Sequence, residues 1–111
     1  MELAKVLKNH SVDLIDVSSG GNIHGVKIPL FDGYQVPFSS QVRNEAEIKT
    51  GAVGLIKKIE HAEEILEKGD ADLVFIAREI LRNPYIAVQG SFEMGEECFF
   101  PHQYLRAKIS K

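Results

Sequence analysis

The chain has 111 residues, of which 44% are hydrophobic and 26% charged, a composition typical of one soluble globular domain and not of a disordered segment. Its formal net charge of −3 and its scattered Lys and Arg residues argue against a nucleic-acid partner, which requires clustered basic side chains. Because no apolar run approaches the roughly 20 residues that cross a bilayer, and because the N-terminus lacks the order of a signal peptide, we expect a cytoplasmic protein without a membrane partner.

The first predicted unit is a strand followed by a long loop and a helix. Residues 12–17 form a short, mostly apolar run that ends in a cluster of turn formers, as a buried strand does. Residues 23–36 have no helical period, and irregular connections of that length are more often functional than idle. Ser39 or Ser40 is then expected to cap a helix that runs to about Lys49.

The second predicted unit begins with a strand-like run over residues 50–56 that contains two glycines, which usually mark a close approach by backbone or ligand. A helix follows, because apolar residues recur at spacings of three and four from residue 59 to residue 66. Glu64 and Lys68 form an i,i+4 pair, and Gly69 suits the left-handed position just after the helix. The acidic residues of this helix are interpreted as a solvated face.

The third predicted unit is a strand over residues 71–76 with a helix that starts almost without a loop and ends near Arg82. Asn83 and Pro84 are expected to cap and open a further helix. From Gly90 onward the sequence predicts a strap on a surface and no further βα unit. Three successive βα units indicate an α/β protein with a parallel sheet.

Two strand ends of this predicted sheet are suited to an anion. In parallel α/β folds, ligands bind where strands end and the next helix offers free N–H groups. Gly54 allows close approach at the end of the second strand, and Arg78 opens a helix directly after the third, where its guanidinium can pair with a phosphate. Without further information, an arginine at a helix start is more often a surface salt-bridge partner.

Seven strings of the sequence, taken in order and spacing, carry a resemblance to a known family. They are Val12–Gly20, Gly33–Val36, Thr50–Gly54, Ala62–Leu66, Ala71–Glu79, Leu81–Pro84 and Gln103–Tyr104. Together they resemble the closing segment of bacterial NADPH dehydrogenases (ene-reductases) of the old yellow enzyme family, over residues 3–107. The resemblance implies a partial TIM (β/α)8 barrel, namely the last three βα units and a C-terminal tail, forming a single partial domain over residues 1–111 without an internal boundary.

The resemblance also implies a cofactor and its binding residues. The phosphate of FMN, with NADPH as the reductant, would be held by the backbone of Gly54 and Ala77 and by the side chain and amide of Arg78. The family usually has glycine at position 77, and the methyl group of Ala77 would crowd the phosphate if the site needs a positive φ. Arg106 stands where the family places an arginine that reaches a neighbouring subunit's active site, so a homo-oligomer is expected, with Tyr104 shaping the same contact.

The family's substrate-orienting and proton-donating residues come from the first five strands of the barrel, which these 111 residues lack. We therefore expect the isolated chain to be inactive, and two hypotheses stay open: the C-terminal piece of an FMN-dependent NADPH dehydrogenase, or a non-catalytic barrel fragment that self-associates or joins the missing segment. An independent flavodoxin-like domain fits the length, but the sequence has neither a fourth and fifth strand nor a phosphate loop after the first strand.

The cysteine and the histidines give no metal site. Cys98 is the single cysteine and has no second thiol at metal-ligand spacing, so it is interpreted as a small apolar residue. The histidines are expected to be surface or satisfied residues, although His24 lies in the long loop at the ligand end of the sheet. They are His10, His24, His61 and His102.

Overall fold

The computed structural model describes residues 1–98 and 100–108, and its chain divides into two compact units. The N-terminal unit covers Met1–Ala77 and holds the sheet, whereas the C-terminal unit begins at Arg78. Among the described residues, no helix is both long and apolar enough to cross a membrane.

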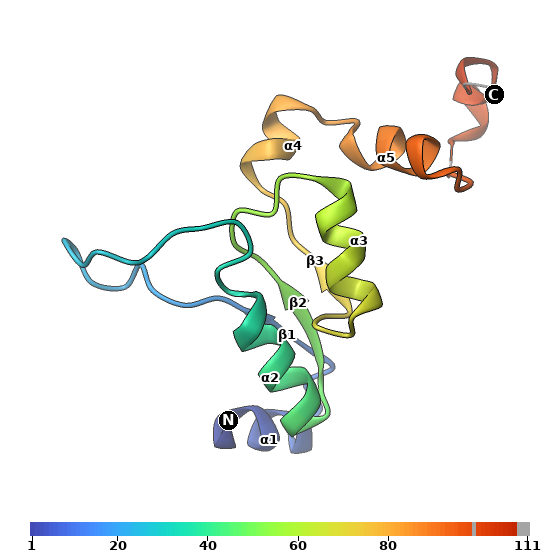
Figure 1. Ribbon diagram of the computed structural model, residues 1–111. Coiled ribbons are helices and arrows are strands. Elements are labelled where there is room, and N and C mark those ends of the chain that lie inside the picture. Colours follow the sequence, from blue (N-terminus) through green and yellow to red (C-terminus); the bar gives the residue numbers. More distant parts are fainter. Residues whose placement is uncertain (99, 109–111) are drawn as a thin grey trace. The chain divides into compact units, whose positions relative to one another are not determined.

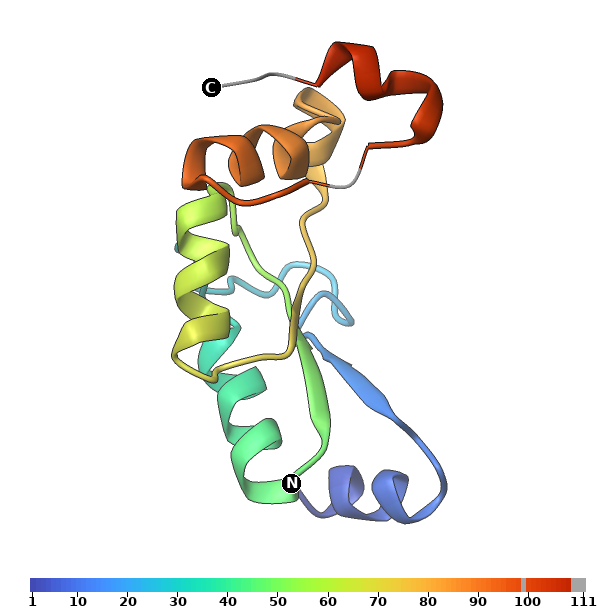
Figure 2. The same cartoon turned by 90° about the vertical axis from the view of Figure 1, so that its right-hand side faces the viewer.

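The N-terminal unit is a three-stranded parallel sheet in the order β1-β2-β3. Its strands are β1 (Leu14–Val17), β2 (Lys49–Ala52) and β3 (Leu73–Val74), with Ile15 opposite Thr50 and Ala52 opposite Val74. Helices α2 (Val36–Ala46) and α3 (Ile59–Glu67) connect the strands and lie on the same side of the sheet (Figures 1 and 2). The predicted α/β class with parallel strands is confirmed, and each strand is shorter than its apolar run.

Two small apolar clusters hold the helices against the sheet. One joins Ala52 and Ile56 to Ala62 and Ile65 of α3, with Ala71 beside them. The other joins residues of α2 and the first strand to α1 (Glu2–Asn9), a helix that was not predicted from the sequence. Its buried members are Ala4, Ala46 and Ile48. All eight buried residues of the two clusters are alanine or isoleucine, and the small alanine side chains allow helix and sheet backbones to approach closely.

Helix α3 follows its prediction closely. Glu64 and Lys68 form an ion pair with a distance of 3.3 Å between oxygen and nitrogen. Gly69 has φ +72°, its N–H donates to the Leu66 carbonyl, and Asp70 N–H donates to the Ile65 carbonyl. This pair of bonds is the Schellman ending, which requires a left-handed residue and so explains why glycine stands there.

The predicted boundaries of α2 are wrong at both ends. The helix begins at Val36, because Pro37 supplies the fixed φ of a first turn and Gln35 is the residue before it. Ser39 does not cap the helix: it is fully buried, and its hydroxyl donates to Thr50 Oγ1 on β2 at 2.8 Å. The helix ends at Ala46, since Glu47 adopts φ +53°, and Lys49 already belongs to β2.

The C-terminal unit contains α4 (Arg78–Arg82), α5 (Ile86–Met94) and the 3-10 helix η1 (His102–Ala107). Helix α5 starts two residues later than predicted, although the Asn83 side chain does accept a bond from Tyr85 N–H at 3.1 Å. The strap predicted from Gly90 is wrong in its start, because Gly90 is buried in the middle of α5. Gly90 lies inside this helix although glycine has a low helix propensity.

Candidate functional site

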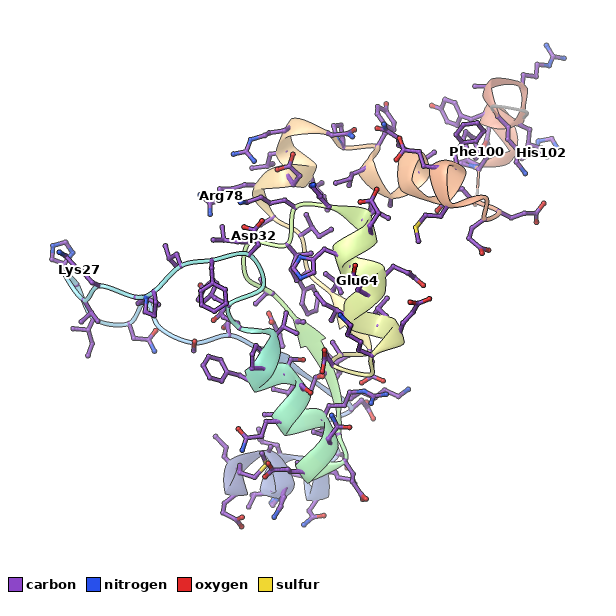
Figure 3. All side chains as sticks on the ribbon, viewed as in Figure 1. Lys27, Asp32, Glu64, Arg78, Phe100 and His102 are labelled. Atoms are coloured by element: carbon purple, nitrogen blue, oxygen red, sulfur yellow. The ribbon has the colours of Figure 1, made fainter. Side chains whose placement is uncertain are left out.

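The carboxyl ends of the three strands form one edge of the N-terminal unit. From β1 the chain runs into the connection over residues 18–35, which projects away from the sheet (Figure 1). The long irregular connection predicted over residues 23–36 is observed, except that Val36 already belongs to α2. Lys27 lies near the tip of this loop (Figure 3). The turn over residues 53–55 follows β2, and residues 75–77 follow β3. Ligands of parallel α/β proteins bind at such an edge.

The turn after β2 has an unusual backbone. Gly54 is buried with φ +125°, and the next residue, Leu55, has φ +54°. A Cβ atom at Gly54 would lie 3.0 Å from the Tyr34 ring and 3.1 Å from Gln35 Nε2, so both the backbone angle and the space select glycine. The segment preceding α2 approaches Gly54 closely, and the approach of a ligand expected at this residue stays a prediction.

Residues 33–35 hold the two carbonyl groups of this turn. Gly33 N–H donates to the Gly54 carbonyl at 2.8 Å, and Gln35 Nε2 donates to the Val53 carbonyl at 3.4 Å. Gln35 Oε1 in turn accepts from Ser19 N–H in the loop after β1. These bonds tie the loops after the first two strands to each other at the ligand edge.

The N–H groups of the same turn remain available. Neither Gly54 N–H nor Leu55 N–H donates to an acceptor among residues 1–98 and 100–108. A buried N–H without an acceptor is rare, since it costs free energy comparable to a lost hydrogen bond. Successive N–H groups in turns of this kind form anion-binding concavities, so the turn is chemically suited to a phosphate.

The other predicted site residues follow β3 in the chain. Ala77 ends the N-terminal unit, and Arg78 is the first residue of α4 and opens the C-terminal unit. Positive φ occurs outside glycine only at Ser11, Glu47 and Leu55 among the described residues. The backbone strain considered for an alanine at position 77 is therefore not present.

Arg78 and Arg106 are both exposed, and neither has an ion pair or hydrogen bond within the described part of the chain. Figure 3 shows Arg78 at the beginning of α4. Tyr104 is also exposed, at 63% of its surface. An arginine at the start of a helix is more often a salt-bridge partner, but Arg78 forms no salt bridge within the described part of the chain. Arg82 of the same helix does form one, with Glu79 at 2.7 Å.

Sequence reasoning missed Gln35 and Leu55. Gln35 belongs to one of the seven family-like strings, but nothing in its local pattern marks a buried glutamine, because its partners are 16 and 18 residues away. Leu55 lies inside what looked like a continuous strand. Its positive φ follows from the turn geometry at Gly54 and has no signal in its own side chain.

An ion pair closes the opposite end of the strands. Arg43 of α2 donates through Nε and Nη2 to the two oxygens of Asp72, at 3.1 and 3.2 Å, and through Nη1 to the Gly69 carbonyl at 3.0 Å. Thr50 N–H also donates to Asp72. The hydrogen bonds from Arg43, and then that from Thr50, hold the pKa of the Asp72 carboxyl below its ordinary value. This cluster joins α2 to β2 and β3 and is structural.

A hollow of about 730 Å³ in the C-terminal unit lies between α5 and the residues that follow it. Cys98, Phe100 and Lys108 contribute to its wall, and none of the predicted site residues does.

Among the described residues, no group of three or more His, Cys, Asp or Glu side chains is arranged to hold a metal ion. His24 is exposed in the long loop, and His61 lies beside Gly33.

The parallel sheet, with two helices on one face, defines an α/β protein of the class whose ligands bind at strand ends. A profile of the NADH:flavin oxidoreductase / NADH oxidase family matches residues 1–92, and the chain belongs to this family. The three parallel βα units are consistent with part of that family's barrel, as the resemblance implied.

Known relatives are similar over nearly the whole chain. This chain is 52% identical over 104 residues to an NADPH dehydrogenase of Listeria innocua. It is 50% identical over 105 residues to an NADPH dehydrogenase of Halalkalibacterium halodurans, and 53% identical over 103 residues to one of a Geobacillus strain. These alignments cover 93–95% of this chain but only 30–31% of the relatives. The chain thus spans about a third of the length of the curated relatives it matches.

Proposed function

We propose that the chain is the C-terminal segment of an FMN-dependent NADPH dehydrogenase of the ene-reductase type, and that it holds the flavin phosphate. The names of the family and of the relatives support a flavin and a nicotinamide reductant. FMN is proposed as the flavin because it ends in a phosphate, the kind of anion that free N–H groups in a turn can bind. The observation that carries the proposal is the pair of N–H groups at Gly54 and Leu55 that have no acceptor in the described chain.

In this proposal the phosphate is bound by backbone amides and one guanidinium. Gly54 contributes its N–H and the absence of a side chain, Ala77 contributes its N–H, and Arg78 contributes two donors that match phosphate oxygens. Helix α4 has only five residues, so the charge of Arg78, and not a helix dipole, supplies the electrostatic attraction. FMN, when bound, supplies the hydride chemistry that the protein lacks; the residues of this chain bind and orient it.

Replacement of Arg78 tests the site. Arg78→Ala should weaken FMN binding by about tenfold to a hundredfold, because a charge-assisted hydrogen bond contributes about 1.5–3 kcal/mol. The side chain is exposed and has no partner in the described chain, so the circular dichroism spectrum should not change. FMN affinity is measured by quenching of flavin fluorescence.

Arg82→Ala is the matched control, since Arg82 is an exposed arginine of the same helix that pairs with Glu79. It should leave FMN affinity within about twofold of the unmodified chain, the scale of a surface substitution. Equal affinity of the two variants would remove Arg78 from the proposed site.

The second candidate function, a non-catalytic fragment that self-associates, is favoured by one observation. The sheet face opposite α2 and α3 is apolar and open: Leu73 is 50% and Phe75 38% exposed. A purified chain that stays yellow after gel filtration supports the FMN-binding proposal, whereas a colourless protein supports the second candidate.

We further propose that Arg106, with Tyr104, acts in a neighbouring subunit's active site, as the family resemblance implies.

A further inference from the structure

Gln35 is a buried polar side chain at the carboxyl edge of the sheet, with only 3% of its surface exposed. Both ends of its amide are used: Oε1 accepts from Ser19 N–H, and Nε2 donates to the Val53 carbonyl. The other buried polar side chains of the unit, Ser39 and Thr50, bond to each other and to nothing at this edge. Gln35 is therefore the side chain that connects the loop after β1 to the turn after β2.

The bond to Val53 has a consequence for the next residue. In a trans peptide the carbonyl and the N–H point in opposite directions, and no cis peptide bond is found among the described residues. By holding the Val53 carbonyl, Gln35 directs Gly54 N–H away from itself. Gly33 N–H does the same one peptide further on, because it holds the Gly54 carbonyl and so directs Leu55 N–H away.

We propose that Gln35 is a positioning residue for the phosphate site: its amide orients the peptide between Val53 and Gly54 so that the Gly54 N–H faces the anion. This inference rests on the proposed function. Gln35 needs no contact with the phosphate. Without its donor, the Val53 peptide is free to turn, and a carbonyl oxygen then competes with the N–H for the side that faces the anion.

The test uses the 111-residue chain and inorganic phosphate as the probe, followed by two-dimensional ¹H–¹⁵N NMR. In the unmodified chain, the amide signals of Gly54 and Leu55 should shift on titration. Gln35→Met, which keeps the length of the side chain and removes both polar ends, should weaken phosphate binding by about tenfold or more and reduce the shift of Gly54. A tenfold change corresponds to about 1.4 kcal/mol.

Gln41→Met is the matched control. Gln41 is an exposed glutamine of α2 whose amide bonds only to Glu45, four residues away, so the same substitution there should change neither the affinity nor the Gly54 shift. A purely structural role of Gln35 would lower the urea midpoint but leave the phosphate affinity of the folded protein unchanged. The affinity of the folded fraction therefore separates the two roles.

Gln35→Glu is a second variant, to be used if Gln35→Met does not fold. It keeps the acceptor for Ser19 N–H and loses the donor to the Val53 carbonyl. A folded Gln35 variant that binds phosphate as tightly as the unmodified chain would overturn the positioning role and leave the phosphate site standing. An unmodified chain that binds no phosphate would overturn both proposals.

Discussion

At the scale of single residues, the turn after β2 depends on glycine at position 54. Gly54→Ala should destabilise the fold by about 1–3 kcal/mol, because φ +125° is a conformation that essentially only glycine adopts. The added methyl group would also press on the Tyr34 ring at 3.0 Å. Urea unfolding followed by circular dichroism measures the change.

Gly25→Ala is the comparison for that experiment. Gly25 also has a positive φ, of +79°, but a methyl group there would meet nothing within 4 Å. Gly25→Ala should lower the free energy of unfolding by about 1 kcal/mol, which is the strain of an alanine in the left-handed conformation alone. Equal costs at the two positions would mean that the contact with Tyr34 and Gln35 contributes nothing.

At the scale of elements, the ion pair of Arg43 and Asp72 couples α2 to the sheet. The folded-state pKa of Asp72 lies below its unfolded value of about 3.9. Its contribution to stability is thus present above that unfolded value and is lost as the pH falls through the folded pKa. Asp72→Asn should lower the free energy of unfolding at pH 7 by about 1 kcal/mol, since both side chains are partly exposed and screened.

The pH dependence is the sharper readout. The free energy of unfolding of the unmodified chain should fall as the pH drops below 4. The free energy of unfolding of the Asp72→Asn variant should decrease less over the same pH range. Asp70→Asn is the control, because the Asp70 side chain has no hydrogen bond or ion pair in the described chain. Parallel pH profiles for the unmodified chain and Asp72→Asn would contradict the role assigned to this pair.

Prediction of elements succeeded where the signal is local. The period of α3, its i,i+4 pair and its terminal glycine all lie within eleven residues, so they can be identified without knowing the fold. The start of α2 could not be predicted in this way, because Ser39 looks like a cap until its bond to Thr50 on a neighbouring strand is known. Similarly, Gly90 predicts a helix end, yet it is buried within α5.

At the scale of the whole molecule, the open sheet face should drive self-association. Alternation along β3 sends Val74 and Ile76 into the core beneath α3 and turns Leu73 and Phe75 to the opposite face. The Phe75 ring lies directly over Gly51, where any Cβ would overlap it. Exposed apolar faces next to unpaired strand edges favour pairing with another chain.

Leu73→Lys should therefore reduce the mass of the chain measured by light scattering to that of a monomer, because a charge on this face must be desolvated on association. Leu81→Lys, at a leucine that is 83% exposed in the C-terminal unit, should leave the mass unchanged. A monodisperse monomer for the unmodified chain would contradict the expectation at once.

The sequence alone determined the order of the βα units, the class of the fold and the family resemblance, because each depends on patterns within a few residues or on strings in a fixed order. Only the tertiary structure decided that Gln35 is buried at the ligand edge, that Leu55 adopts a positive φ, and that the turn carbonyls are held while its N–H groups are left available. These features arise from contacts between segments 15 to 20 residues apart, and such contacts exist only once the strands have paired.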